Sequence, residues 1–368
     1  MTRLLHKVAR SWPPDEKNHR HGILRKFLHV SPPIICIVLY IYNLSGFMTA
    51  RTVEDILEVI NFVSVFTTAT GRNFLLALTK PKIHALVSKT IEMEKTRRAD
   101  ELSSIQCQIM KKWRNIHDKL TKFSIYGVWV GALMYLIPPI FFSKLPFPGY
   151  STKGLEESKW FYAIYFLQLL FACIFIPPWI SVDFYVCTFL CTLCRELDMF
   201  YDAMQNIRDK DRSYLYRVID RHSRILTYGM EVCDIVSYSF GVVHASYGVF
   251  LIFGTIAMTQ INWSTHGGLA IRNIITMIVC ASSLSLMCFI GDLIQDLSTR
   301  LGDCIVLDNF LDRRKDRKYL KLLEIVHARS CCSLKIKYSP NMIVNMQMYS
   351  VTLNYILSIY TFALTVMA

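Results

Sequence analysis

The sequence predicts an all-α integral membrane protein with seven transmembrane helices, and three observations lead to this fold class. Apolar residues make up 53% of the 368 residues and charged residues only 19%, a balance typical of proteins that bury helices in lipid. Seven stretches reach the roughly 20 mostly apolar residues that cross a bilayer. Basic residues collect in alternate connections between these stretches, as they do in multi-pass proteins.

Each predicted span is bounded by charged or turn-forming residues. The second is the weakest, because Asp55 and Glu58 crowd its first turns and Arg72 sits in its second half. The N-terminal 26 residues hold charges but no compact apolar stretch before a cleavage site, so the first span is expected to act as a signal anchor. The seven spans are Ser31–Ala50, Glu54–Thr79, Phe123–Ser143, Trp160–Leu193, Val236–Gln260, Ala270–Ile290 and Met342–Ala368.

Basic residues predict the orientation, because Lys and Arg mark the cytoplasmic side of helical membrane proteins. The N-terminal arm and the 80–122, 195–225 and 300–337 connections hold 35 of the 41 basic residues. The N-terminus is therefore predicted in the cytoplasm and, with seven spans, the C-terminus is extracellular. The formal charge of +13 is explained by this topology, so the bilayer suffices as partner and no nucleic acid is predicted. The glycosylation acceptor Asn262 falls in a connection assigned outside, in agreement.

The long inner connections alternate charged and apolar residues at helical spacing, as at Leu193, Leu197 and Met204. This pattern predicts helices that extend past the bilayer into a cytoplasmic anchor layer. Amphipathic helices lying on the membrane surface are the alternative. Pro340 disfavours helix for the residue before it, so the last helix is predicted to be split. The predicted parts are a cytoplasmic arm (1–30), helices one to six (31–299), a cytoplasmic anchor segment (300–338) and a pore-lining last helix (339–368).

Motifs that carry enzyme chemistry are absent, since there is no His-Glu-x-x-His, no Gly-x-Ser-x-Gly, no P-loop and no dinucleotide glycine pattern. Neither an enzyme nor a cofactor is predicted. Cys187, Cys191 and Cys194 share one helical face and could ligate a soft metal. Packing is the favoured interpretation, because no His or carboxylate completes a tetrahedral set.

Acidic residues at the ends of spans are costly in a membrane and are therefore functional candidates. The sequence places Asp183, Asp234 and Asp292 in such positions, each toward the predicted cytoplasmic end of its helix. Pairing with inner basic residues is the simpler interpretation, and a role in an ion pathway is the alternative.

Aromatic residues recur at helical spacing in the outer or middle parts of several spans. If they face inward, they form an apolar cavity suited to a small, weakly polar organic molecule. Lipid-facing belts and ordinary helix packing are the competing interpretations. The predicted ligand pocket consists of Phe62, Val65, Phe66, Trp129, Leu133, Tyr162, Tyr165, Phe166, Leu169, Tyr247, Ile274, Met277 and Ile278.

The end of the chain resembles a known family. After Tyr338 the sequence reads SPNMIVNMQMYSVTLNYILSIYTFALTVMA. This small-polar helix, with Tyr360 followed by Thr361 a few residues from the end, resembles the C-terminal signature of insect odorant receptors. The seven predicted spans, the inside N-terminus, the short outer loops and the proline-broken last helix are similar to that family as well.

The resemblance implies a cation channel that is a tetramer formed with a co-receptor, in the plasma membrane of olfactory sensory neurons. A small volatile ligand would bind in the outer half, and the last helices would line a central pore. The connection Arg195–Leu226 lacks the long insertion of the co-receptor, which favours a ligand-tuning subunit. Counting back from the C-terminus, the implied pore and gate positions are Tyr360, Ala363, Leu364 and Met367.

Other classes of multi-pass membrane protein are alternatives to an odorant receptor. A gustatory receptor channel is the nearer alternative, because it shares topology and fold with the odorant family. A G-protein-coupled receptor requires the N-terminus outside, against the charge distribution, and the sequence has neither an Asp-Arg-Tyr triplet nor an Asn-Pro-x-x-Tyr turn. A transporter is disfavoured because no inverted repeat is visible.

Overall fold

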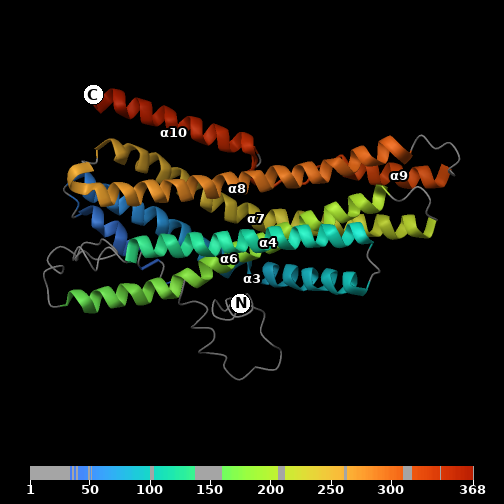
Figure 1. Ribbon diagram of the computed structural model, residues 1–368, viewed down its shortest axis with the longest axis horizontal. Coiled ribbons are helices and arrows are strands. Elements are labelled where there is room, and N and C mark those ends of the chain that lie inside the picture. Colours follow the sequence, from blue (N-terminus) through green and yellow to red (C-terminus); the bar gives the residue numbers. More distant parts are fainter. Residues whose placement is uncertain are drawn as a thin grey trace, which may run out of the picture.

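The computed structural model is a bundle of long helices that lie side by side, with α9 at one end and α10 at its edge (Figure 1). It describes residues 34, 37–38, 40–48, 50, 52–99, 103–136, 160–205, 212–260, 263–309, 317–339 and 341–367. The elements are the 3-10 turn η1 (Gly46–Met48), α3 (Val53–Ala99), α4 (Ser104–Leu136), α6 (Phe161–Gln205), α7 (Arg212–Gln260), α8 (Trp263–Asn309), α9 (Arg317–Ser330), β1 (Lys337–Ser339), β2 (Met342–Ile343) and α10 (Met346–Met367).

Four helices are much longer than a bilayer requires. α3, α6, α7 and α8 contain 47, 45, 49 and 47 residues, so each is about 70 Å long at 1.5 Å per residue. A hydrocarbon core is about 30 Å thick. The helices therefore extend beyond the bilayer into the connections whose periodicity predicted helix, and each of these connections is shared by two consecutive helices.

By length and composition, two stretches of the described chain could cross a membrane, Tyr216–Ile256 and Asn273–Arg300. They overlap the predicted fifth and sixth spans. Residues 137–143 of the predicted third span and part of the predicted first span lie outside the described residues, as does Asn262. The number of spans stays a prediction.

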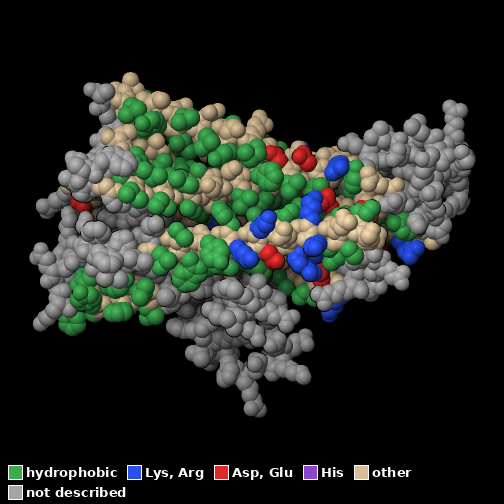
Figure 2. Space-filling view, viewed as in Figure 1, with side chains coloured by type: hydrophobic (Ala, Val, Ile, Leu, Met, Phe, Trp, Pro, Cys, Tyr) green, Lys and Arg blue, Asp and Glu red, His purple; other side chains and the backbone are tan. Residues whose placement is uncertain are grey.

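Apolar and charged side chains separate along the bundle. Figure 2 shows hydrophobic side chains over one half of the visible face and Lys, Arg, Asp and Glu over the other half. In the helix extensions, apolar residues turn inward, and Leu193, Leu197 and Phe200 of α6 are completely buried. Each Å² of apolar surface removed from water contributes about 25 cal/mol. The extensions are thus stabilised as a water-soluble core would be.

The connection between α9 and α10 is an extended segment that runs against α7 and α8. Its strands β1 and β2 pair antiparallel, and the Val344 amide donates to the carbonyl of Ile336 over 2.9 Å. The amide of Leu334 donates to Oγ of Ser298 on α8 over 3.0 Å. These bonds satisfy backbone groups that no helix pairs. The predicted break near Pro340 is therefore present as a hairpin, although Pro340 itself lies outside the described residues.

A glycine on α8 permits the closest approach of this segment. A Cβ added to Gly291 would overlap the carbonyl oxygen of Val344. Backbone cannot move aside as a flexible side chain can, so the position requires a residue without a side chain. Met342 and Ile343 form strand β2 of the hairpin. For this reason α10 begins at Met346, four residues after the start of the predicted span.

A buried ion pair joins α3 to α6. Nη1 of Arg72 lies 2.8 Å from Oδ1 of Asp183, and the two side chains are 2% and 17% exposed. Asp183 was expected to pair with an inner basic residue, but its partner is the arginine of the predicted second span. The charge that made this span the weakest of the seven is thereby matched by a carboxylate.

We expect Arg72→Leu or Asp183→Leu alone to destabilise the protein by about 3–5 kcal/mol, because each leaves an uncompensated buried charge. The double variant removes both charges and should recover most of that loss. Thermal unfolding of the purified protein in detergent measures the effect. Lys82→Leu is the control, because its pair with Asp234 is exposed and surface ion pairs contribute little. A double variant no more stable than the single ones would contradict the assignment.

Candidate functional site

The candidate ligand region begins with an aromatic stripe on α3. Phe62 and Phe66 follow Val59 at helical spacing, and the three side chains are 2%, 1% and 2% exposed, with Phe66 the most buried. α3 packs along α7, and the two helices are joined by a hydrogen bond from the Thr68 hydroxyl to the Ser246 hydroxyl over 2.6 Å. Both predicted phenylalanines therefore lie inside the bundle.

Two predicted residues of α7 and α8 pack on a cluster to which α10 also contributes. Tyr247 and Met277 pack on a small buried cluster that α7, α8 and α10 share. Met277 is in close contact with α7, since a Cβ added to Gly254 would lie 3.3 Å from its side chain. This arrangement makes two predicted ligand contacts share a cluster with the predicted pore helix. The cluster consists of Val243, Phe250, Leu251, Cys280, Leu284 and Ile356.

The other predicted pocket residues differ in exposure. Tyr165 is buried, and its ring meets that of Phe166 edge-on at 6.0 Å. Leu169 and Ile274 are partly buried, and the side chain of Val65 is outside the described set. Five predicted residues are exposed by 46–67%, and in this single chain they lie on the outer surface, namely Trp129, Leu133, Tyr162, Phe166 and Ile278.

The helix α10 is packed on one side only. It contacts α7 and α8, and within its described side chains Ile356 is the one that is buried. Tyr355 and Phe362 are 66% and 69% exposed. Of the predicted gate positions, Tyr360 and Ala363 are partly buried and Leu364 is 41% exposed, whereas the side chain of Met367 lies outside the described ones.

Polar side chains on α10 bond to their own helix. The hydroxyls of Ser350, Ser358 and Thr365 donate to carbonyls four residues earlier, over 3.1, 2.8 and 2.6 Å. Such back-bonding satisfies the hydroxyl without a partner from another element. The bare side of α10 therefore mixes apolar groups with hydroxyls and carries no fixed charge.

The start of α10 is held by α8. The Met346 amide donates to Oδ2 of Asp292 over 3.0 Å, and the Met348 amide donates to Oδ1 of Asn345 over 2.8 Å. The first amides of a helix have no partner within the helix, and such oxygens satisfy them. The carboxylate of Asp292 and the carboxamide of Asn345 cap the helix. Together with the close contact at Gly291, these caps fix where α10 begins.

The family model of the 7tm odorant receptors matches residues 52–357, most of the chain. The chain belongs to the 7tm odorant receptor family. Among curated proteins, none matches it. Members of this family are membrane receptors of olfaction rather than enzymes, so this odorant receptor is a membrane protein.

Solved structures agree with this odorant receptor in fold. It is similar to the insect olfactory receptor OR5 from Machilis hrabei in complex with eugenol, and to a second structure of OR5. Each has 12% sequence identity and a TM-score of 0.83, with 99% of this chain and 97% of the other covered. At this identity the likeness concerns the fold alone.

The three acidic candidates of the receptor have different partners. Asp234 pairs with Lys82 over 3.0 Å, as predicted for an inner basic residue. That hydrogen bond and the charge of Asp234 raise the pKa of Lys82, so the ammonium group stays charged at neutral pH. Asp183 pairs with Arg72 inside the bundle. Asp292 accepts the amide of Met346 instead of a basic side chain, which differs from the predicted pairing.

Sequence reasoning missed Gly291 and the role of its neighbour Asp292. Their contacts, Val344 and Met346, lie more than 50 residues away, and no local motif links an extended segment to a helix that distant. The one local signal is Asn345, because an Asn before an apolar run is typical of a helix N-cap.

We expect Asp292→Ala to weaken the start of α10 by about 1 kcal/mol, the usual effect of losing a capping oxygen. Hydrogen exchange of the first α10 amides should accelerate about fivefold. Asp292→Asn keeps an acceptor oxygen and should change exchange little. Asp296→Ala, an exposed aspartate one turn along α8, is the matched control, and equal exchange in Asp292→Ala and Asp296→Ala would contradict the assignment.

Proposed function

We propose that this odorant receptor is a ligand-tuning subunit of a non-selective cation channel, assembled with a co-receptor in a heterotetramer. The one-sided packing of α10 is the observation that carries this proposal. A helix whose bare side mixes apolar groups and self-bonded hydroxyls suits a surface that meets both neighbouring subunits and water. Four such helices around an axis would enclose a pore.

In this proposal the gate is an apolar constriction near the end of α10. Ala363 and Met367 are spaced i, i+4 and so share one helix face, with Tyr360 one turn before Ala363 and Leu364 beside it. An apolar constriction stops ions by excluding water, and conduction begins when the helices separate. The polar residues earlier in α10 would keep the rest of the pore hydrated.

The proposed topology has seven spans with the N-terminus in the cytoplasm. The arm 1–30, the anchor segment 300–338 and the charged half of the bundle in Figure 2 would face the cytoplasm. Helices one to six (31–299) would hold the ligand, and residues 339–368 would line the pore. The receptor would reside in the plasma membrane of olfactory sensory neurons.

The ligand in this proposal is a small, apolar or weakly polar volatile. Phe62 and Phe66 supply buried aromatic surface, and Tyr247 adds one hydroxyl. Tyr247 and Met277 also contact the cluster that includes Ile356 of α10, so a ligand that displaces either side chain would act directly on the pore helix. Eugenol, which OR5 binds in its structure, is a reasonable first compound.

The overall test is co-expression with a co-receptor and a screen of volatile compounds for cation currents. We expect ligand-dependent currents only when both subunits are present. Currents from the co-receptor alone that match those of the pair would remove the proposed role in ligand tuning.

Epitope tags test the topology. An antibody should reach a tag at Met1 only after permeabilisation and a tag at Ala368 without it. The reason is that the N-terminal arm and the connections predicted on its side of the membrane hold most of the basic residues, which mark the cytoplasmic side. The opposite staining would exclude the channel proposal.

Truncation of an aromatic tests the pocket. Phe66→Ala should weaken the ligand response by about 2–5 kcal/mol, the range for losing a buried aromatic anchor, at normal surface expression. Trp129→Ala is the informative comparison, because Trp129 is 49% exposed in the single chain. A reduced response in both variants supports a pocket that α4 helps to form. Wild-type dose–response curves in both would place the pocket elsewhere.

Polar substitution tests the gate. Ala363→Ser or Met367→Ser should raise ligand-free current or change cation permeability ratios, because a hydroxyl hydrates an apolar constriction. Thr361→Ser, on the exposed side of α10, is the control. If both gate variants reach the surface and conduct as the wild type does, these residues meet lipid or a neighbouring helix instead.

A further inference from the structure

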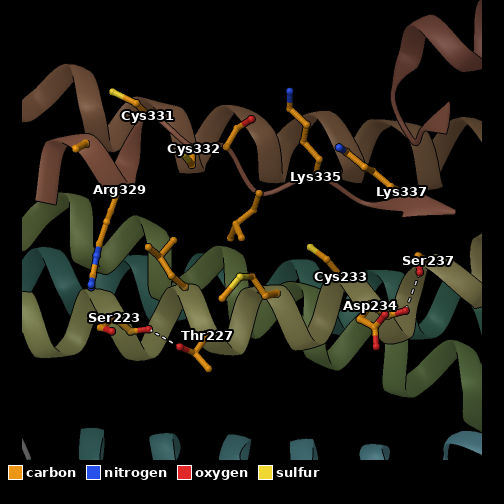
Figure 3. Close-up of a pocket in the computed structure, with 15 residues that line it drawn as sticks. Ser223, Thr227, Cys233, Asp234, Ser237, Arg329, Cys331, Cys332, Lys335 and Lys337 are labelled. Carbon is orange, nitrogen blue, oxygen red and sulfur yellow. Dashed lines mark hydrogen bonds between the residues drawn. The ribbon is translucent and has the colours of Figure 1, made fainter. Parts of the chain in front are cut away.

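A groove of about 1020 Å³ lies between α7 and the extended segment that follows α9 (Figure 3). One wall is a stripe of α7, in which Thr227, Met230 and Asp234 follow one another at helical spacing. The other wall includes Lys335 and Lys337. No residue of the predicted ligand pocket or of α10 lines this groove.

The two lysines leave the extended segment on the same side. Side chains alternate along an extended chain, and residues two apart are separated by about 7 Å. Leu334 and Ile336 are 6% and 1% exposed and point into the core, so Ser333, Lys335 and Lys337 occupy the opposite side. Figure 3 shows both lysines leaving the segment in one direction. Two ammonium groups are thereby presented along one wall.

The cations of this groove have no carboxylate partner among the described residues. Arg329, Lys335 and Lys337 all line it, and the ion pairs of the described chain involve other basic residues. Asp234 is the one acidic side chain in the lining, and Lys82 neutralises it. The groove therefore carries a net positive charge that a bound anion would compensate.

The lining is also partly apolar. Leu226 and Ala328 belong to it, and Met230 is 59% exposed although methionine is usually buried. Hydroxyls of Ser223 and Thr227 stand nearby on α7. Leu334 lies against Gly229 and Tyr338 against Gly241, so these groups lie further from the predicted span than Lys337 does, and an anion at the membrane surface would reach the lysines first.

The position of the groove fits a membrane lipid. Ser237, at one end of the lining, is the second residue of the predicted span Val236–Gln260, and Lys337 precedes the predicted last span by five residues. Both lie at the proposed cytoplasmic boundary of the bilayer, where anionic phospholipids concentrate. Soluble phosphate compounds share the charge but are not concentrated at the bilayer surface.

We propose that this groove binds the headgroup of an anionic phospholipid of the cytoplasmic leaflet, with its phosphate at Lys335 and Lys337. The inference uses the proposed orientation of the chain but not its channel activity. Each lysine near an anionic surface strengthens binding by about fivefold. Loss of both should weaken binding by about 30-fold.

Two native thiols allow a direct test. Cys331 and Cys332 line the groove and are exposed, and Cys107 is exposed on α4, away from the groove. The full chain is placed in nanodiscs of phosphatidylcholine, with or without a minor fraction of phosphatidylserine. The rate of alkylation by N-ethylmaleimide is then followed at each cysteine by peptide mass spectrometry.

Phosphatidylserine should slow alkylation at Cys331 and Cys332 several-fold and leave Cys107 unchanged. The Lys335→Gln/Lys337→Gln variant should lose this protection over the same lipid range. The matched control is Lys119→Gln/Lys122→Gln, which removes the same charge from exposed residues of α4 near the predicted third span; it should keep the protection.

Three results would overturn the proposal. Protection that both lysine variants retain would mean that lipid does not bind through Lys335 and Lys337. Equal protection by soluble inositol trisphosphate in pure phosphatidylcholine would assign the site to a free phosphate. Thiols protected from alkylation in every lipid would mean that another copy of the chain covers the groove. Each outcome is read without ligand-gated current, so it is independent of whether the proposed channel function holds.

Discussion

The ion pair between Arg72 and Asp183 is the constraint around which the bundle is arranged. A guanidinium that is 2% exposed would cost several kcal/mol without its carboxylate, so α3 and α6 must stay within hydrogen-bond distance at this level. The aromatic stripe with Phe66 lies on one side of the pair along α3, and the core residues Leu76 and Ile83 lie on the other. The pair thus stands where the candidate ligand region ends and the helix extensions begin.

The extended connection to α10 is a second constraint, and it follows from backbone chemistry. A segment with no helical hydrogen bonds cannot be buried unless its amides find other acceptors. Here Ser298 and Asp292 of α8 accept amides at both ends of the segment, and the β-hairpin pairs its middle. Because Asp292 also caps α10, any movement of α8 reaches α10 through a direct contact. The cluster around Ile356 forms a second contact on the same helix.

Periodicity and composition were sufficient to predict the long helices. Leu193, Leu197 and Phe200 recur at helical spacing, and all three are buried in the continuous α6. Pro340 was sufficient to predict the break before α10. The hairpin could not be predicted, because strands of three and two residues are too short to show alternation. The direction in which an aromatic side chain faces could not be predicted either. Phe66 and Trp129 both fit helical spacing, but Phe66 is buried and Trp129 is half exposed. Only the neighbouring helices decide between these positions.

The two ends of α10 are held very differently, and this difference bears on how a gate could work. Its first turn is capped by Asp292 and Asn345, and Ile356 packs midway on α7 and α8. Beyond Ile356, no described side chain of α10 is buried. The contacts of α10 lie at its first turn and at its middle. A small tilt of the helix at these contacts therefore displaces its far end most. The predicted gate residues Ala363 and Met367 lie at that far end, and in the proposed tetramer neighbouring subunits would supply the contacts that hold it. A gate placed there, as proposed, would respond both to assembly and to the packing of the cluster around Ile356, which Tyr247 and Met277 also contact.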